Sequence, residues 1–283
     1  MTLDSLVLHP RTKKDAERIA RRLPHALIIN GPSGVGVTEL AKAIARENRS
    51  PEFTILPKKK IKNEFVVDMN DGNIVIEDIR DLYAQTRTKQ PGKHVYILDT
   101  GEKTITPSAQ NAFLKLLEEP RSDVHFIIAT HHPDQLLPTI TSRCQRLQLL
   151  PVTDEQTTYL VKELGVNDET KVKRLAFVGR GRPALLKRLA NSEEEYNARV
   201  QIMTDAKVLL SGSLYEKLSI VQKYRDNRPD CLTLLEDAVY QLHTVIKSSQ
   251  NRSLIKSIEM YLQAHDNIAA GGNIRLQLTS AVL

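Results

Sequence analysis

The chain has 283 residues, of which 41% are hydrophobic and 26% are charged, and its formal net charge is +6. This length predicts about two or three domains with their own cores, and the basic excess favours contact with nucleic acid or an acidic partner. The two cysteines, Cys144 and Cys231, lie far apart without a CxxC pair, which excludes a disulfide framework and a zinc ribbon, and we expect no metal site. No apolar run approaches the ~18 residues of a membrane span, and no signal-peptide pattern opens the sequence, so we expect a cytoplasmic protein.

The first predicted elements are a helix, a strand, a loop and a second helix. Residues 12–23 have the spacing of a basic amphipathic helix, and residues 26–29 form a short apolar run closed by Asn30-Gly31-Pro32. From Thr38 to Asn48 apolar residues recur at three- and four-residue steps, which predicts a helix. A loop between a strand and a helix is therefore expected at residues 30–37.

A hairpin is predicted next in the chain. Apolar residues at 65–67 and 74–76 flank the turn signal Asn70-Asp71-Gly72. The preceding lysines are interpreted either as phosphate contacts or as an ordinary solvated loop; they are Lys58, Lys59, Lys60 and Lys62. A helix carrying Ile79, Leu82 and Tyr83 follows the hairpin.

The rest of the chain divides into a part with strands and a part without them. Buried strands are predicted at 95–98 and 125–129, and the helix between them starts at Thr106-Pro107 and ends at Pro120. Strands that alternate with helices predict an α/β fold with three layers and a mostly parallel sheet. From Thr153 onward only helical periodicity is present. The expected domains are an α/β domain at 1–150, a helical lid at 151–192 and an all-α domain at 193–283.

The loop after the first strand matches a phosphate-binding loop (P-loop) in part. The segment from Gly31 to Thr38 keeps the first and last glycines and the hydroxyl residue of the motif, and it lies between a strand and a helix. In a working P-loop a lysine neutralises the β- and γ-phosphates, and here Val37 occupies that position. A charge-assisted hydrogen bond contributes about 1.5–3 kcal/mol, so its loss alone weakens phosphate binding roughly ten- to a hundredfold.

A second departure lies after the strand at 95–98. An ATPase places there an aspartate that organises magnesium and a glutamate that activates water, whereas this chain has Asp99 and Thr100. Glu102 is interpreted as a solvated loop carboxylate. These losses argue against hydrolysis by this chain and leave two interpretations of the loop: a turn without a ligand, or a weak residual site for ATP or ADP. No cofactor is required under either one.

The segment at 111–146 carries a longer pattern. It reads NAFLKLLEEPRSDVHFIIATHHPDQLLPTITSRCQR and resembles AAA+ subunits of the DNA polymerase III clamp loader, in its NAxLKxLEEP helix end and its Ser142-Arg143-Cys144 trio. Residues 24–27 and 76–82 are similar to delta-prime subunits in particular, and residues 273–276 resemble the last helix of the family's collar. The similarity extends over most of the chain and is thin between 190 and 265.

This resemblance implies an AAA+ domain, a lid, a C-terminal collar and a role in assembly. It implies that Arg143 reaches in trans into the ATP site of a neighbouring motor subunit, although a surface arginine in a helix-capping salt bridge remains the alternative. The implied degenerate nucleotide site comprises Gly31, Gly34, Gly36, Thr38, Asp99, Arg182, and Thr130 at the sensor 1 position. Cys144 is expected to be a small buried residue without redox or metal function.

The implied partners are gamma- or tau-like ATPase subunits, a delta-like clamp-opening subunit, the sliding clamp and, through the complex, primer-template DNA. One departure from the family is the absence of cysteine at 49–66, where many of its members carry a zinc module. Arg182, in Gly179-Arg180-Gly181-Arg182, keeps the pattern of a nucleotide-sensing lid arginine, and it is interpreted as a nucleotide contact, a DNA phosphate contact or a solvated charge.

Other functional classes remain open from the sequence. An ATP-hydrolysing motor subunit or a DNA-repair ATPase with an atypical P-loop is opposed by Val37 and Thr100. A small-molecule P-loop kinase is opposed by the same residues and by the helical second half of the chain.

Overall fold

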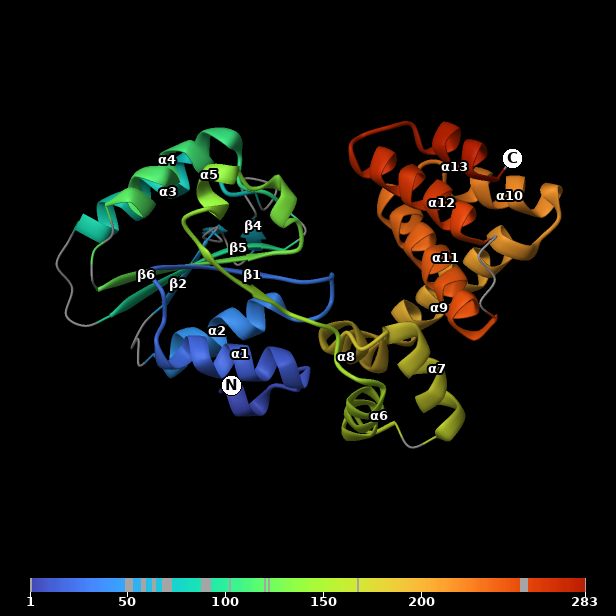
Figure 1. Cartoon of the computed structure of the whole chain (residues 1–283), viewed down its shortest axis with the longest axis horizontal. Coiled ribbons are helices and arrows are strands. Elements are labelled where there is room, and N and C mark those ends of the chain that lie inside the picture. The colour runs from blue at the N-terminus through green and yellow to red at the C-terminus, as the bar shows by residue number, and fades with distance from the viewer. Residues whose placement is uncertain are drawn as a thin grey trace. The chain divides into compact units, whose positions relative to one another are not determined.

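The structure is a computed structural model that describes residues 2–48, 53–56, 60–62, 65–67, 73–87, 93–101, 103–119, 121, 123–166, 168–249 and 254–282. The chain forms two compact units, residues 1–190 and residues 191–283. The first unit holds the sheet and the second is helical (Figure 1). The expected lid at 151–192 falls almost wholly within the first unit, and its separation as a domain stays a prediction.

A five-stranded parallel sheet forms the centre of the first unit. Its order is β2-β5-β6-β1-β7, with β1 at Ala26–Asn30, β2 at Phe53–Leu56, β5 at His94–Gly101, β6 at Val124–Thr130 and β7 at Gln145–Gln148. The three predicted strands are the central β1, β5 and β6, which confirms the α/β fold class. Because β7 pairs with β1, the strand that follows Cys144 runs beside the strand that leads into the P-loop.

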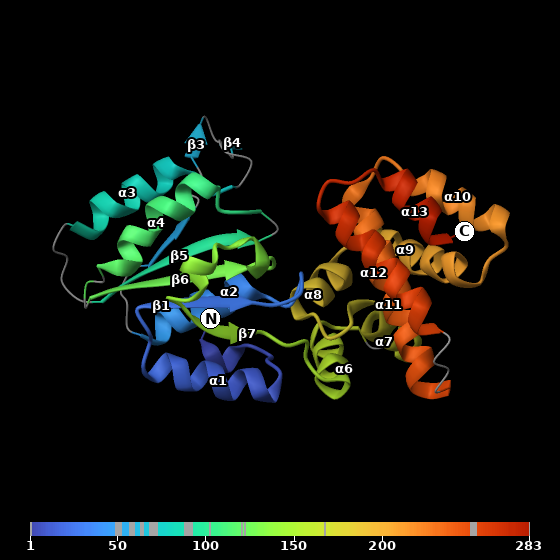
Figure 2. The ribbon, with the colours of Figure 1, turned by 45° about the horizontal axis from the view of Figure 1, so that its top comes forward.

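Helices cover both faces of this sheet. α1 (Pro10–Arg21) and α2 (Val37–Glu47) lie on one face, and α3 (Ile76–Arg87), α4 (Pro107–Glu118) and α5 (Pro138–Thr141) lie on the other (Figures 1 and 2). Strand β1 shows why its sequence is a continuous apolar run. Leu27 and Ile29 belong to the core under α1 and α2, whereas Ile28 belongs to the core under α4. A strand buried on both faces needs apolar side chains at every position.

The predicted hairpin has a different partner strand. β4 (Phe65–Val67) pairs with β3 (Lys60–Lys62) in antiparallel fashion, and Ile74 instead forms an isolated parallel bridge with Ile105. The pairing of 65–67 with 74–76 is therefore wrong. The predicted strand at 74–76 does not form because a helix begins at Ile76. The Asp78 carboxylate accepts a hydrogen bond from the Val75 amide at 2.9 Å and caps this helix. The predicted turn at 70–72 and Lys58 and Lys59 lie outside the described residues.

The remaining elements of the first unit are two short 3-10 helices and the α-helices that follow the sheet. The 3-10 helices are η1 (Leu3–Ser5) and η2 (Pro133–Gln135), and the α-helices are α6 (Asp154–Glu163), α7 (Glu169–Gly179) and α8 (Pro183–Asn191). Thr153 caps α6 in a reciprocal capping box with Gln156, since each side chain bonds the backbone amide of the other residue. This cap explains why the helical pattern begins where the sequence shows it.

The second unit is all-helical, as predicted. It consists of α9 (Glu193–Ser211), α10 (Leu214–Tyr224), α11 (Arg228–Ser249), α12 (Leu254–Ala269) and α13 (Ile274–Val282). Its apolar core includes Leu234, Leu235, Ile268 and Leu278, each with no exposed surface. Burial of these residues holds the described helices of this unit together.

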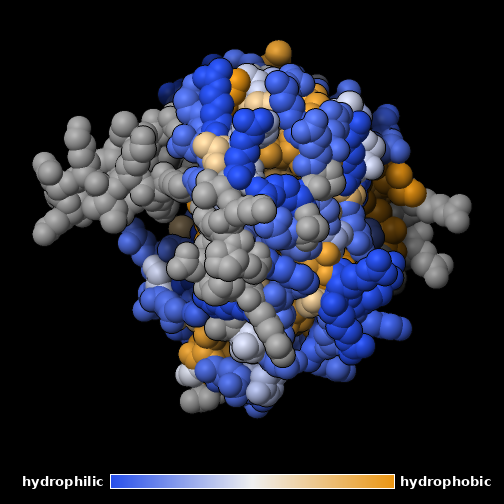
Figure 3. All heavy atoms as spheres, turned by 90° about the vertical axis from the view of Figure 1, so that its left-hand side faces the viewer, coloured by the Kyte–Doolittle hydropathy of each residue, from blue (hydrophilic) through white to orange (hydrophobic). Residues whose placement is uncertain are grey.

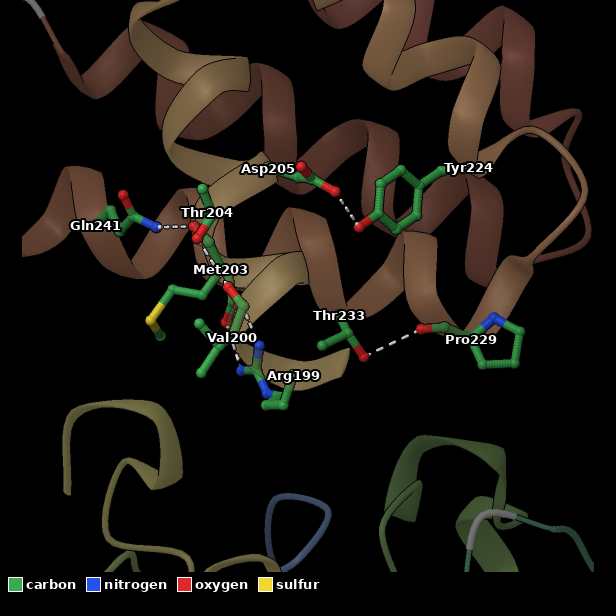
Figure 4. A network of polar contacts seen from close by, with 10 residues as sticks. Arg199, Val200, Met203, Thr204, Asp205, Tyr224, Pro229, Thr233 and Gln241 are labelled. Carbon is green, nitrogen blue, oxygen red and sulfur yellow. Dashed lines mark hydrogen bonds and ion pairs between the residues drawn. The ribbon is translucent and has the colours of Figure 1, made fainter. Parts of the chain in front are cut away.

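Buried and part-buried polar contacts join α9 to α10 and α11 in the second unit. Arg199 on α9 makes a bidentate ion pair with Asp237 on α11, and the bond from Nη2 to Oδ1 is 2.7 Å. Asp205 on α9 accepts a 2.7 Å hydrogen bond from the Tyr224 hydroxyl of α10, and Gln241 donates to the Met203 carbonyl at 3.1 Å (Figure 4). These bonds satisfy polar groups that apolar packing leaves without water.

No helix in the described ranges is long and apolar enough to cross a bilayer. On the face shown in Figure 3, hydrophilic residues cover most of the coloured surface and hydrophobic ones are scattered among them. Scattered exposed apolar residues of this kind are normal for a folded domain.

Candidate functional site

The P-loop segment lies where the sequence places it, between β1 and α2. Gly36 stands at the N-cap of α2 with φ +99°, and Gly34 has φ +82°. Both angles lie in the left-handed region, which glycine adopts without strain. The Val35 amide donates to the Pro32 carbonyl at 3.2 Å and closes a turn inside the loop. The glycines of the motif therefore have a backbone role independent of any phosphate.

Val37, at the lysine position of the motif, belongs to the hydrophobic core. Its side chain is 1% exposed and lies in the core cluster with Leu40 and Ile44 of the same helix. A lysine there would extend an ammonium group toward phosphate, whereas this side chain is packed away from solvent. The loop has no cation at the position where P-loop chemistry uses one.

Thr38, the hydroxyl residue of the motif, bonds Asp99 on β5. The Thr38 hydroxyl donates to the Asp99 carboxylate with an Oγ1 to Oδ1 distance of 2.9 Å. Burial raises the pKa of the Asp99 carboxyl above its usual value, and the hydrogen bond from Thr38 opposes that rise. Thr100 is 4% exposed, and its hydroxyl donates to the Ala129 carbonyl of the neighbouring strand, so its polar group already has a hydrogen-bond partner within the sheet. Glu102 lies outside the described residues.

The end of β6 is joined to the P-loop by a histidine. Thr130 is buried, and its hydroxyl accepts a 3.0 Å hydrogen bond from the His132 amide. Beside it, His131 Nδ1 donates to the Gly31 carbonyl at 2.7 Å. No sequence pattern predicted this histidine contact, because a histidine after a strand has no required partner.

Helix α8 closes onto the loop. The Gly34 carbonyl accepts hydrogen bonds from the Ala184 amide at 2.9 Å and from the Leu185 amide at 3.1 Å. A Cβ atom built on Gly34 would lie 2.8 Å from Leu185 Cβ, so only glycine fits this approach. Amides of a helix N-terminus are the usual donors to an anion, and here two of them bond the chain itself.

Arg182 lies directly before α8, within the segment that meets the P-loop. Its side chain is half-buried, and its amide donates to the Gly179 carbonyl at 2.9 Å. The structure thus places Arg182 directly before the helix whose first amides bond the Gly34 carbonyl.

Arg143 lies on the surface at the end of α5. Its side chain is 39% exposed; Nη1 donates to the Thr139 carbonyl at 3.0 Å, and Nη2 donates to Glu118 Oε1 at 3.0 Å. The surface salt bridge that the sequence left as the alternative is therefore present, and the side chain remains partly exposed to solvent. A guanidinium keeps its charge and binds phosphate oxygens in a fork, so this group is available to a second molecule.

The neighbours of Arg143 in the chain turn back to the protein. The Ser142 hydroxyl donates to the Thr139 carbonyl at 3.1 Å. Cys144 is half-buried rather than buried, and burial raises the pKa of its thiol to about 11. A thiol with such a pKa stays protonated, and no group of metal-ligating residues occurs among the described residues.

The family described as "DNA polymerase III, delta subunit" matches residues 12–153, which is about half of the chain. The chain belongs to this family. The match contains the degenerate P-loop, Asp99 and Arg143, and it ends before Arg182 and the second unit. The resemblance drawn from residues 111–146 is confirmed.

Curated relatives agree with the family. The chain is 27% identical over 207 residues to DNA polymerase III subunit delta' of Pseudomonas aeruginosa, with 67% of this chain and 62% of that protein covered. It is 25% identical over 268 residues to delta' of Escherichia coli, covering 83% and 77%, and 32% identical over 151 residues to subunit tau of Bacillus subtilis, covering 48% and 26%. The match thus spans less than two thirds of the Pseudomonas protein.

Solved structures show the same fold. The Thermotoga maritima RuvB Holliday junction branch migration motor superposes with a TM-score of 0.53 at 15% identity, covering 98% of this chain and 89% of that one. A second RuvB structure, of a point mutant from the same organism, gives a TM-score of 0.52 at 16% identity, covering 88% and 80%. These likenesses support the AAA+ P-loop fold and carry no statement about activity.

One further residue of this delta-family chain, Gln110, was not predicted from the sequence. Gln110 on α4 is 3% exposed, donates to the carbonyls of Ile105 and Gln135 at 2.9 and 3.0 Å, and accepts from the Leu137 amide at 2.7 Å. It ties α4 to the loop that leads into α5 and Arg143. A buried polar residue in an apolar helix face was the available signal.

Proposed function

We propose that this chain is a subunit of a DNA polymerase III clamp loader that does not hydrolyse ATP and lends Arg143 to the ATP site of a neighbouring motor subunit. The observation that carries the proposal is the contrast between a solvent-accessible guanidinium at residue 143 and a buried valine at residue 37. Arg143 places a cation at the surface, where a second molecule can bind it, whereas the P-loop has no cation at residue 37.

The absence of self-hydrolysis follows from the chemistry of the P-loop. Transfer of a phosphoryl group requires a cation at the β- and γ-phosphates and a residue that orients water. Val37 and Thr100 supply neither, and both side chains are packed into the unit. The contact of α8 with Gly34 further supports a loop held by the protein rather than by nucleotide, and we propose that no cofactor is required.

The contribution of Arg143 is electrostatic. An arginine finger supplied in trans stabilises the charge that develops on the transferred phosphoryl group and accelerates hydrolysis by about 10³–10⁵-fold. Such a finger must reach beyond its own subunit, which requires exposure at a rigid corner. Arg143 meets that requirement because α5 is tied to α4 by Gln110 and Glu118.

The proposed partners follow from this role. They are gamma- or tau-like ATPase subunits, a delta-like subunit that opens the clamp, the sliding clamp itself and primer-template DNA reached through the complex. The second unit would serve as the collar, and the complex would act in the cytoplasm.

The decisive experiment measures ATP hydrolysis by a complex reconstituted from this chain and motor subunits of its own organism. Arg143→Ala is expected to reduce hydrolysis at the site that receives the arginine by about 10³-fold. Arg146→Ala is the matched control, because Arg146 is an exposed arginine three positions further on. An unchanged rate with Arg143→Ala would remove the proposed role.

The alternative is an ATPase with an atypical P-loop, a motor subunit or a DNA-repair enzyme. The retained Thr38–Asp99 pair at the magnesium position favours it. The purified chain alone, assayed with ATP and magnesium, discriminates the two. We expect no turnover, and sustained turnover that survives further purification would support the alternative.

A further inference from the structure

We propose that Glu118 is a positioning residue for Arg143: its carboxylate holds the guanidinium while the remaining N–H groups bind the phosphate of the neighbouring subunit. This inference rests on the proposed function of Arg143. It assigns a role to a glutamate at the C-terminal end of α4, where the sequence showed only a helix end.

The geometry fixes the guanidinium at two of its nitrogens. Nη1 donates to the Thr139 carbonyl of its own α5, and Nη2 donates to Glu118 Oε1 at the end of α4, each at 3.0 Å. Two acceptors on different elements define the plane of the group, which one acceptor alone would leave free to rotate. Nε and the second N–H of Nη1 and of Nη2 remain to contact phosphate oxygens.

The pair has little structural purpose. The side chains of Arg143 and Glu118 are 39% and 53% exposed, and ion pairs this open to water add little to the free energy of unfolding. An arginine side chain without the pair would sample many rotamers. Ordering it before the neighbour arrives removes that entropy loss from the catalytic step, which is the benefit of positioning.

The platform under Glu118 is rigid. Phe113 and Leu117 anchor α4 in the apolar core, and Gln110 near the start of the helix holds the Gln135 carbonyl and the Leu137 amide of the loop before α5. One helix thus fixes both ends of the segment that presents Arg143. A carboxylate at the end of such a helix transmits that rigidity to the guanidinium.

The test compares Glu118→Ala and Glu118→Gln in the reconstituted complex. Loss of the carboxylate is expected to lower kcat roughly three- to tenfold while the KM for ATP changes less than about twofold, because only the transition-state contact is misplaced. Glutamine keeps an acceptor oxygen and is expected to retain most of the rate. Glu119→Ala removes an equal charge from the neighbouring exposed position and is expected to change nothing.

A double-mutant cycle separates positioning from a general effect of charge. In the Arg143→Ala background, Glu118→Ala is expected to cause no further loss, since the group that it positions is gone. Additive losses would overturn the inference, and so would a faster Glu118→Ala complex, which would show that the carboxylate competes with phosphate. Thermal unfolding of each variant tests folding, and Glu118→Ser, which also lacks the carboxylate, replaces the alanine variant if that variant fails to fold.

The outcomes also separate this inference from the proposed function. If Arg143→Ala slows hydrolysis and Glu118→Ala does not, the proposed role of Arg143 as an arginine finger is retained and the positioning role of Glu118 is overturned. If Arg143→Ala leaves the rate unchanged, both are overturned.

Discussion

Two arginine–carboxylate pairs lie in opposite environments in this chain. In the second unit, Arg199 and Asp237 have side chains 9% and 0% exposed, and they bond each other at both ends of the fork. In the first unit, Arg143 and Glu118 are 39% and 53% exposed and share one bond. Arg199 cannot exchange its partner at low cost because no water replaces a lost bond in the interior. Arg143 at the surface retains N–H groups that can bond another molecule.

The largest expected effect tests the buried member of the comparison. Asp237→Ala leaves the Arg199 guanidinium buried without its carboxylate and should lower the free energy of unfolding by about 3–5 kcal/mol. Chemical denaturation followed by circular dichroism measures this change. The control is Asp226→Ala, because Asp226 pairs with Arg225 at the surface with 82% of its side chain exposed. Equal losses in both variants would contradict the distinction.

The P-loop extends the comparison to an uncharged group, the Gly34 carbonyl, whose hydrogen-bond partners also lie within the chain. Gly34→Ala introduces a Cβ 2.8 Å from Leu185 Cβ at a φ of +82°, and we expect a loss of about 2–3 kcal/mol from strain and steric conflict. Gly36→Ala has a similar φ of +99° but nothing within 4 Å of the new Cβ, so about 1 kcal/mol of strain alone is expected. Urea denaturation of the two variants isolates the steric conflict with Leu185, and equal losses would show that the added methyl group at residue 34 meets no such conflict.

A smaller change is expected at the exposed pair. Arg143→Ala and Glu118→Ala should each shift the free energy of unfolding by less than about 1 kcal/mol, since surface ion pairs contribute little. The same denaturation measurements on the isolated chain test this. A loss near that of Asp237→Ala would mean that Arg143 serves the fold of its own unit.

The smallest effect concerns the residue next to Arg143. Burial raises the pKa of the Cys144 thiol to about 11, so the neutral form dominates at pH 8 and alkylation should be slow. The rate should rise about tenfold per pH unit until the pH approaches that pKa. Mass spectrometry of the Cys144 peptide after iodoacetamide treatment measures it, with the urea-unfolded chain as control. Rapid labelling of the folded chain at pH 8 would show an outward-facing thiol.

Some elements could be predicted from local signals alone. Thr106-Pro107 predicted the start of α4, and the Thr106 hydroxyl accepts from the Ala109 amide as a helix cap does. Strand β7 was missed because only Leu147 of its residues is buried, so an edge strand shows little hydrophobic pattern. The hairpin was assigned to the wrong partner because apolar residues at 74–76 suit both a strand and the start of a helix.

The sequence by itself determined what the nucleotide site lacks. A valine at residue 37 and a threonine at residue 100 exclude an ammonium group and a carboxylate wherever the fold carries them. Only the tertiary structure decided which groups meet. Gly34 bonds α8, His131 bonds Gly31, and Arg143 bonds Glu118 across long stretches of chain. The physical reason is that residue identity fixes the available chemistry, while packing of distant elements fixes the distances at which that chemistry operates.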